Sequence, residues 1–201
     1  MSMRELSIEG AWEVVPTVHA DDRGGFFEAF RAESLADAIG HPFSLAQMNV
    51  SLSRRGVVRG IHYADVPPSQ AKYVQCLRGA IVDFVVDIRV GSPTYGQWEG
   101  VRLDDTGHGA LYLSEGLGHA FVALEEETTV AYLVSEPFNA PREHGISPLD
   151  PAIGLEFPFE ADELVLSAKD REAPSLAEAL AAGALPAYDE AVAYRRSLGA
   201  R

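Results

Sequence analysis

The 201-residue sequence predicts an all-β fold, an antiparallel sandwich or barrel that ends in short helices. Short runs rich in β-branched and aromatic residues recur along residues 1–165. Gly and Pro clusters separate these runs at roughly 8–15-residue intervals, the spacing of antiparallel sandwiches and barrels. The length suits one domain. We therefore expect a single domain over 1–201, with a β core over about 1–165 and a helical tail over about 175–201.

The clearest strand is expected over residues 80–90, where Ile, Val and Phe dominate until the run stops at Gly91. Three further apolar runs have the same character. They cover residues 110–113, 120–124 and 128–134.

Helices are expected in two parts of the chain. Residues 29–39 can form a short helix that ends near Gly40. In the tail, Ser175 and Glu178 have the spacing of a capping box ahead of an alanine-rich run, and a second helix is expected over 189–198. A tail of about 30 residues is too small to be stable alone, so we expect it to pack on the β core.

Charge and cysteine content restrict the class of protein. The sequence contains 16 Lys and Arg and 30 Asp and Glu, which gives a net charge of −14. Such a charge disfavours nucleic acid and membrane surfaces as partners. A locally basic cleft still allows a phosphorylated small molecule. The single cysteine, Cys76, excludes a disulfide framework within one chain and an all-cysteine zinc site. No apolar run is long enough to span a membrane, and residues 1–5 lack the layout of a signal peptide, so we expect a cytoplasmic protein.

Several common catalytic motifs are absent from the sequence. It contains no G-x-G-x-x-G after a strand, no P-loop, no H-E-x-x-H and no G-x-S-x-G. Nicotinamide binding by a Rossmann fold, P-loop phosphoryl transfer and ordinary serine hydrolysis therefore lose support.

Two neighbouring stretches hold candidate functional side chains. Strand alternation would put Arg59 and His62 on opposite faces, unless Gly60 introduces a bulge between them. Gln70 and Lys72 would share one face, and a lysine beside a buried site can stabilise an oxyanion or a phosphate. The alternative is a surface arginine, a core histidine and a solvated lysine.

Two glycine-containing turns and one distant carboxylate complete the candidates. Gly116 and Gly118 precede His119, which suggests a tight turn that presents the imidazole at a strand start. Arg23 and Phe26 flank a glycine turn that could clamp a phosphate and stack on a base, or be an ordinary hairpin. Nothing in spacing alone links Asp170 to any of them.

Taken together, these segments resemble the dTDP-4-dehydrorhamnose 3,5-epimerases and their relatives in deoxysugar pathways, the RmlC-like cupins. The matches keep the family's order and spacing from about residue 4 to residue 185. The matching segments are Asp22-Arg23-Gly24 with Phe26 and Glu28, Gln47-Met48-Asn49 with Ser51, residues 56–62, residues 70–74, residues 86–89 with 92–96, residues 115–121 and residues 166–170.

The resemblance implies a cupin-type antiparallel jelly roll and a homodimer. Residues 116–119 look like a remnant of the second cupin motif. His62 stands alone where a metal cupin carries an H-x-H pair, so a full ligand set is missing. The family uses neither a metal nor a cofactor, and the resemblance therefore implies none here.

Roles follow by position from the same resemblance. His62 would be the general base that removes a proton beside the C4 ketone, and Asp170 would orient it. Lys72 would stabilise the enolate oxygen, and Tyr132 would return a proton from the opposite face. Arg23 and Arg59 would contact the diphosphate, and Phe26 would line the nucleotide end. The full substrate-binding set is Arg23, Phe26, Glu28, Gln47, Asn49, Arg59, His119, Glu143 and Lys169.

The implied function is epimerisation of dTDP-4-keto-6-deoxyglucose at C3 and C5. Phe138 stands where the family often carries a second tyrosine, and relatives that invert only C3 or only C5 exist, so a mono-epimerase is the alternative. A 3,4-ketoisomerase fits less well, because Gln70-Ala71-Lys72 and residues 166–170 match the epimerases. A non-catalytic sugar-binding module would not need to keep His62 and Tyr132.

Overall fold

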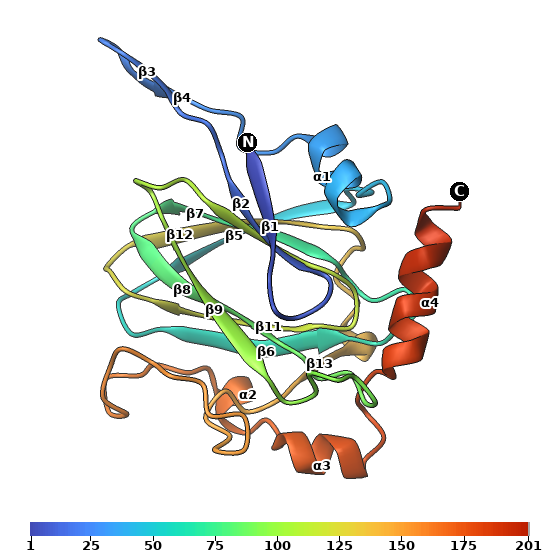
Figure 1. Ribbon diagram of the computed structural model, residues 1–201. Helices are drawn as coiled ribbons and strands as arrows, with labels where there is room; N and C mark the ends of the chain where they lie inside the picture. Colours follow the sequence, from blue (N-terminus) through green and yellow to red (C-terminus); the bar gives the residue numbers. More distant parts are fainter. Residues whose placement is uncertain (201) are drawn as a thin grey trace.

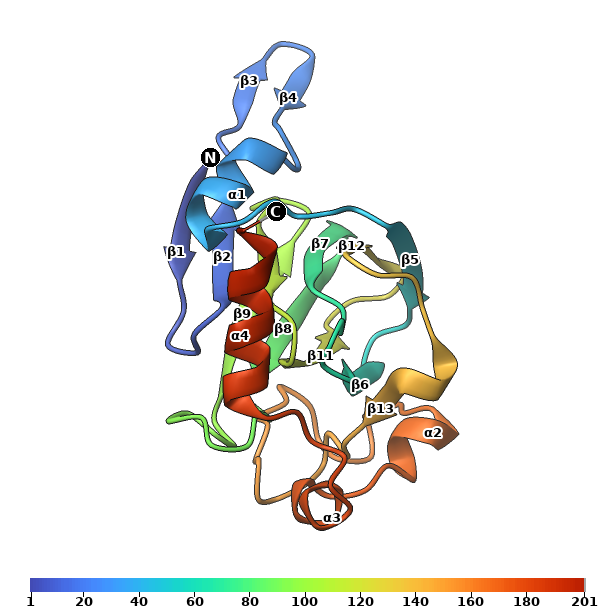
Figure 2. The same cartoon turned by 90° about the vertical axis from the view of Figure 1, so that its right-hand side faces the viewer.

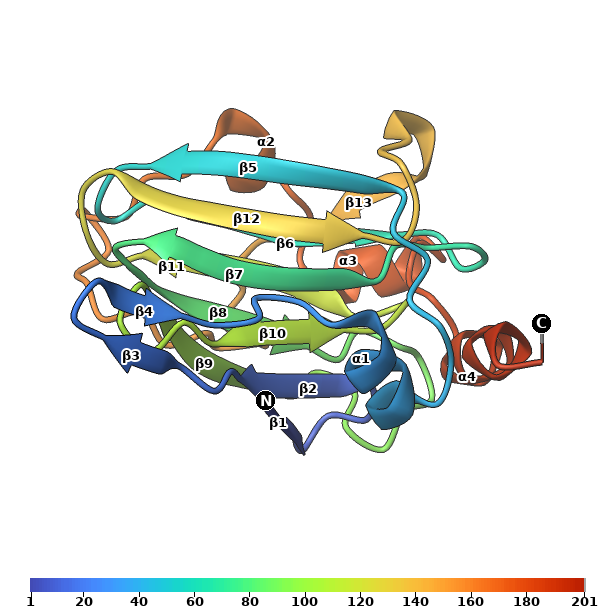
Figure 3. The ribbon, with the colours of Figure 1, turned by 90° about the horizontal axis from the view of Figure 1, so that it is seen from above.

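Two antiparallel sheets stack face to face in the computed structural model, which describes residues 1–200 (Figure 1). Figure 3 looks onto the first sheet, in which strands run in the order β1-β2-β10-β7-β12-β5. Its strands are β1 (Ser2–Glu5), β2 (Ala11–Val15), β5 (Gln47–Ser53), β7 (Lys72–Arg78), β10 (Ala110–Leu113) and β12 (Thr128–Val134).

The second sheet has the order β13-β6-β11-β8-β9. Its strands are β6 (Val58–Ala64), β8 (Ala80–Val86), β9 (Trp98–Asp104), β11 (Gly118–Ala123) and β13 (Glu143–Gly145). A separate hairpin, β3 (His19–Asp21) and β4 (Gly24–Phe26), projects away from the two sheets (Figure 1). The arrangement confirms the predicted antiparallel two-sheet fold.

Helices lie outside the sheets. They are α1 (Ala32–Ile39), the 3₁₀ turn η1 (Ala140–Arg142), α2 (Ala168–Arg171), α3 (Leu176–Ala181) and α4 (Tyr188–Leu198). Figure 2 shows α4 standing upright along one side of the molecule. None of the helices in residues 1–200 is long and apolar enough to cross a membrane.

The predicted helix ends are largely confirmed. Gly40 closes α1 in the left-handed conformation at φ +82°, although the helix begins three residues later than expected, at Ala32. The capping box is present at α3: the Ser175 hydroxyl accepts from the backbone N–H of Glu178, and the Glu178 carboxylate accepts from the Ser175 N–H. The last predicted helix corresponds to α4.

The predicted strands over 110–113 and 128–134 are confirmed at both ends, and the one expected over 120–124 runs from 118 to 123. The prediction over 80–90 was too long, since β8 stops at Val86. The reason is Asp87, which is fully buried and accepts hydrogen bonds from Arg89, Ser92 and Thr94. These bonds organise a loop in place of a strand.

One half of the interior between the sheets is filled by apolar side chains. Apolar side chains that alternate inward along both sheets pack there, including Val74 and Leu111 from one sheet and Ile81, Val85 and Phe121 from the other. This cluster holds the sheets together by burial of apolar surface.

Two further clusters cover the outer faces. The segment that follows β13 packs Ile153 and Leu176 on Phe84 and Val122 of the second sheet. Helix α1 covers part of the first sheet with Leu35. The outer face of the edge strand β5 stays uncovered. There Met48, Val50 and Leu52 are 56%, 57% and 72% exposed.

Candidate active site

A bulge in β6 decides which of its side chains point between the sheets. The pairing of β6 with β11 puts His62 opposite His119 and Arg59 opposite Phe121, so two residues of β6 face one residue of β11. Gly60 has φ +110°, and a Cβ there would lie 2.3 Å from the His119 carbonyl oxygen. Only glycine fits. The bulge leaves both Arg59 and His62 on the wall of one cavity, as the conditional prediction required.

The polar half of the interior is a cavity of about 500 Å³. Both sheets and the short helix α2 contribute to its wall. Its polar lining residues are Asn49, Arg59, His62, Gln70, Lys72, Tyr132, Glu143, His144, Ser167, Lys169 and Asp170, with Phe138 among the apolar ones. Sequence positions up to 121 residues apart therefore meet at one site.

His62 and Asp170 form a close pair, with 2.6 Å between Nε2 and Oδ1. Burial alone would raise the Asp170 pKa. That pKa is nevertheless below its ordinary value, because His62 contributes a hydrogen bond and its charge, and the Ser167 hydroxyl and the Gly60 amide contribute further hydrogen bonds. An ionised carboxylate only accepts hydrogen bonds, so Nε2 carries the proton. In the neutral ring, the Nδ1 lone pair of His62 is then left free to act as a base.

The geometry of α2 brings Asp170 to His62. Ser167 is the N-cap of this helix, and its hydroxyl interacts with the backbone N–H of Asp170 at 3.0 Å. The cap thereby fixes the turn whose third residue faces the histidine. The Asp170 side chain is 7% exposed, compared with 37% for His62. The imidazole therefore lies between a buried carboxylate and the open cavity.

Lys72 and Tyr132 reach the cavity from the other sheet. Lys72 is 7% exposed, and burial lowers its pKa, while the charges of Glu143 and Glu115 oppose that change. Burial raises the pKa of Tyr132, so its phenol stays protonated at neutral pH. The histidine base and these two groups thus stand on opposite walls.

The cavity is locally basic although the chain is strongly acidic. Arg59, Lys72 and Lys169 line it, against the carboxylates of Glu143 and Asp170. Lys72 and Lys169 are the only two lysines in the sequence. The Arg59 guanidinium is held by the Leu52 carbonyl at 3.0 Å. Such a wall suits an anionic ligand.

Two predicted binding residues lie just outside the lining. The Gln47 amide donates to Asn49 at 2.6 Å and accepts from the backbone N–H of Phe138 at 3.3 Å, so it braces two lining residues. His119 is 9% exposed, and its Nε2 lies 2.6 Å from Oδ1 of the fully buried Asp83. The sequence interpretation included His119 but missed its carboxylate partner.

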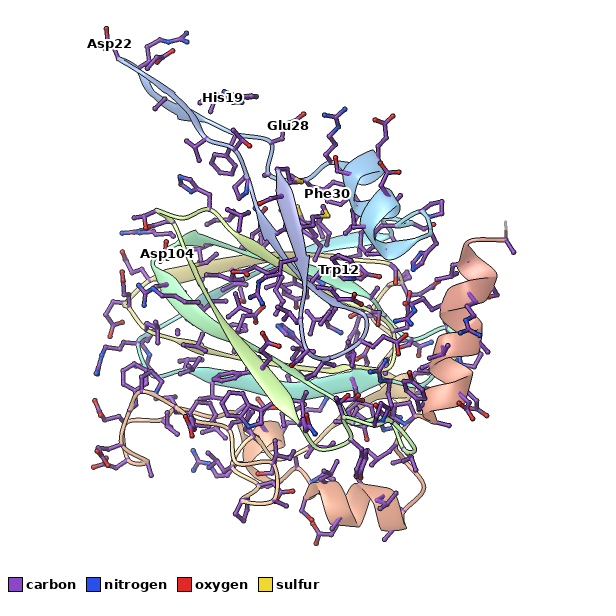
Figure 4. All side chains as sticks on the ribbon, viewed as in Figure 1. Trp12, His19, Asp22, Glu28, Phe30 and Asp104 are labelled. Carbon is purple, nitrogen blue, oxygen red and sulfur yellow. The ribbon has the colours of Figure 1, made fainter. Side chains whose placement is uncertain are left out.

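Three other predicted binding residues lie far from the cavity within one chain. Arg23 and Phe26 belong to the projecting hairpin, and Glu28 follows it. Figure 4 shows Asp22 at the hairpin tip and Glu28 nearer its base. Arg23 pairs locally with Asp21 at 2.5 Å. The remaining predicted site residues all line the cavity or, like Gln47 and His119, lie beside it.

Two polar lining residues were missed as candidates by the sequence interpretation. His144 lies on the short strand β13, with its Nε2 2.7 Å from Asp65, and a three-residue strand gives no recognisable pattern. Ser167 was detectable, because Ser167 and Asp170 have the spacing of an N-cap and its N3 residue. Among residues 1–200, no group of three or more His, Cys, Asp or Glu side chains is placed to hold a metal ion.

Comparison with known proteins gives a consistent result. The family model described as dTDP-4-dehydrorhamnose 3,5-epimerase matches residues 5–178. A dTDP-4-dehydrorhamnose 3,5-epimerase of Mycolicibacterium smegmatis is 54% identical over 98% of this chain and 97% of that protein. A dTDP-4-dehydro-6-deoxyglucose 3-epimerase of Streptomyces bikiniensis is 50% identical over 92% and 94% of the two chains.

Solved structures agree in fold. The rmlC epimerase of Mycobacterium tuberculosis superimposes with a TM-score of 0.96 at 44% identity, over 98% of this chain and all of that one. The 3'-monoepimerase ChmJ of Streptomyces bikiniensis, solved with dTDP-quinovose, has a TM-score of 0.96 at 47% identity, over 99% of this chain and all of that one. Enzymes that invert two carbons and enzymes that invert one are thus similar to this chain to nearly the same degree.

Proposed function

The chain belongs to the dTDP-4-dehydrorhamnose 3,5-epimerase family of nucleotide-sugar epimerases, and we propose that it inverts both C3 and C5 of dTDP-4-keto-6-deoxyglucose. The observation that supports this most directly is the His62–Asp170 pair at the cavity wall. It supplies a base for a proton made acidic by the neighbouring C4 ketone.

The reaction follows from the placement of the groups. His62 Nδ1 takes the proton from the carbon beside the ketone, and the electron pair moves to the ketone oxygen. The Lys72 ammonium stabilises the resulting enolate by its charge in a buried site. Tyr132, from the opposite wall, returns a proton to the other face of the same carbon, which inverts it. His62 then loses its proton to solvent, and the tyrosinate regains one.

The nucleotide part is assigned by charge and shape. Arg59 and Lys169 offer positive charge for the diphosphate, and both line the cavity. Phe138 is 63% exposed, and its ring is free to lie against a planar base. In this role a phenylalanine serves as well as a tyrosine.

We further propose that the protein acts as a homodimer whose hairpins serve the partner's cavity. Arg23 and Phe26 match the family's binding residues but sit on a hairpin that projects away from their own cavity, and Phe26 is 69% exposed. A second copy is the simplest source of the missing contacts. The uncovered face of β5, with Met48 and Leu52, offers apolar surface of the kind that interfaces bury.

Exchange in D₂O tests the reaction. With dTDP-4-keto-6-deoxyglucose, we expect the wild-type protein to exchange the protons at both C3 and C5 with turnover, as followed by NMR. His62→Asn should slow exchange at both carbons by roughly 10²–10⁴-fold. The matched control is His144→Asn, which removes the other histidine of the cavity wall and should retain exchange at both carbons. Rapid exchange by His62→Asn would rule out His62 as the base.

Replacement of Phe138 by tyrosine tests the choice between one and two inverted carbons. If the residue serves only as an aromatic surface, the ratio of C5 to C3 exchange rates should change by less than about threefold in Phe138→Tyr, which is under about 1 kcal/mol. A wild type that exchanges C3 alone, with C5 exchange gained in Phe138→Tyr, would instead identify a mono-epimerase limited by the missing hydroxyl.

Mixed dimers test the contribution of the hairpin. Arg23→Ala/Phe26→Ala and His62→Asn should each be inactive alone. Mixed in equal amounts and allowed to exchange subunits, they should recover about a quarter of wild-type activity, since half of the dimers are mixed and each has one intact site. If mixing recovers nothing while native mass spectrometry shows mixed dimers, the hairpin does not act in the partner's cavity.

A further inference from the structure

Glu115 is a buried carboxylate that the proposed reaction does not use. Strand β10 ends at Leu113, which pairs with Lys72 at the start of β7, and Glu115 follows two residues later. It is 4% exposed, and its Oε2 has no hydrogen-bond partner among residues 1–200. A buried carboxylate with an unsatisfied oxygen is costly, so its position calls for a compensating charge.

Two cations from different elements interact electrostatically with this carboxylate. Lys72 belongs to the cavity wall, and Arg195 belongs to α4 on the outer side. Burial raises the pKa of Glu115, and the like charge of Glu136 adds to the rise. A hydrogen bond to its own backbone N–H and the charges of Arg195 and Lys72 oppose that rise. Glu115 itself does not line the cavity. Its charge therefore acts on Lys72 without entering the cavity.

The turn that carries Glu115 is fixed in place. The Gly116 N–H donates to the Ser69 hydroxyl at 3.2 Å, and the Ser114 N–H donates to the Gly10 carbonyl at 2.9 Å. A Cβ on Gly116 would lie 3.0 Å from the Ala191 Cβ of α4, so this helix packs directly on the turn.

Helix α4 is itself anchored to the β core. Glu9, in the loop before β2, accepts hydrogen bonds from both Tyr188 and Arg195. The guanidinium of the buried Arg89 lies 5.1 Å from the centre of the Tyr188 ring. Arg195 thus has a defined position beside the turn that carries Glu115, where it lines a pocket together with Ser114.

The Lys72 ammonium has little other support. Among residues 1–200 it makes no hydrogen bond or ion pair, and only the carboxylates of Glu143 and Glu115 raise its depressed pKa. The other titratable or charged groups on the cavity wall are Arg59, His62, Tyr132, His144, Lys169 and Asp170. Loss of one of the two supporting carboxylates leaves a buried ammonium less able to stay charged.

We propose that Glu115 is a positioning residue for the epimerisation, which acts through Lys72 and keeps its ammonium charged from outside the cavity lining. The importance of Glu115 for catalysis rests on the proposed function of Lys72. The electrostatic coupling between Glu115 and Lys72 is independent of that function and can be measured without substrate.

The direct test uses lysine-selective ¹³C labelling and an NMR pH titration of the whole protein. Only Lys72 and Lys169 give side-chain signals, and Lys169→Arg assigns them. Burial has already lowered the Lys72 pKa, so its charge is lost as pH rises through that lowered value. Glu115→Gln removes the opposing carboxylate and should move the Lys72 midpoint to lower pH. Glu115→Asp, which keeps the charge, should restore most of the shift.

Glu9→Gln is the matched control, because it removes a carboxylate that anchors α4 without facing Lys72. It should lower thermal stability but leave the Lys72 midpoint in place. An unchanged midpoint in a folded Glu115→Gln, or an equal shift in Glu9→Gln, would overturn the proposal.

Turnover supplies the second readout. In Glu115→Gln the alkaline limb of the kcat profile should move to lower pH, with roughly three- to tenfold less activity at its alkaline end and little change in KM. A shifted midpoint with an unshifted limb would overturn the catalytic role. A wild type without exchange activity would instead refute the proposed function and leave the Glu115–Lys72 coupling standing.

Discussion

The bulge at Gly60 is the constraint on which the site depends. In a regular strand Arg59 and His62 would face opposite sides of the second sheet. The extra residue turns both toward the cavity, and the same glycine offers its amide to Asp170. Because a Cβ at Gly60 would lie 2.3 Å from the His119 carbonyl oxygen, the backbone of β11 permits no larger residue. One backbone irregularity thus sets the positions of His62, the proposed base, of its carboxylate partner Asp170 and of Arg59, a proposed binding residue.

The two-sheet architecture then separates the chemical roles. The second sheet supplies His62, and the first supplies Lys72 and Tyr132. In the proposed reaction, a sugar ring between the sheets would meet His62 as base on one face and Tyr132 as acid on the other, which inversion at carbon requires. The apolar half of the interior keeps the two sheets at a fixed separation through close packing. In the proposal above, Glu115 supports the charge of Lys72 from outside the cavity lining, and α4 packs on the turn that carries Glu115.

Local patterns in the sequence predicted much of the fold and part of the site. Alternating apolar runs located the strands around 110–113 and 128–134, and the Ser175 capping box located α3. The strand predicted over 80–90 ends at Val86 instead. Ser92 and Thr94 donate hydrogen bonds to Asp87 and form a loop there, and a strand pattern does not predict such bonds.

The pairing of distant residues was beyond local patterns. His62 and Asp170 are 108 residues apart, and only the family resemblance linked them before the structure placed them 2.6 Å apart. The face on which Arg59 and His62 lie depends on register with β11, which the sequence of β6 alone does not determine. The burial of Glu115 and its electrostatic interaction with Lys72 likewise result from tertiary packing.

The most direct test of the central claim is the tautomer of His62, read by ¹⁵N NMR in histidine-labelled protein. The chain has six histidines, and His62→Asn assigns the signal. In the neutral ring we expect a protonated Nε2 bound to Asp170 and an unprotonated Nδ1, with this preference lost in Asp170→Ala. A proton on Nδ1 in the wild type would contradict the assignment of His62 as a base oriented by Asp170.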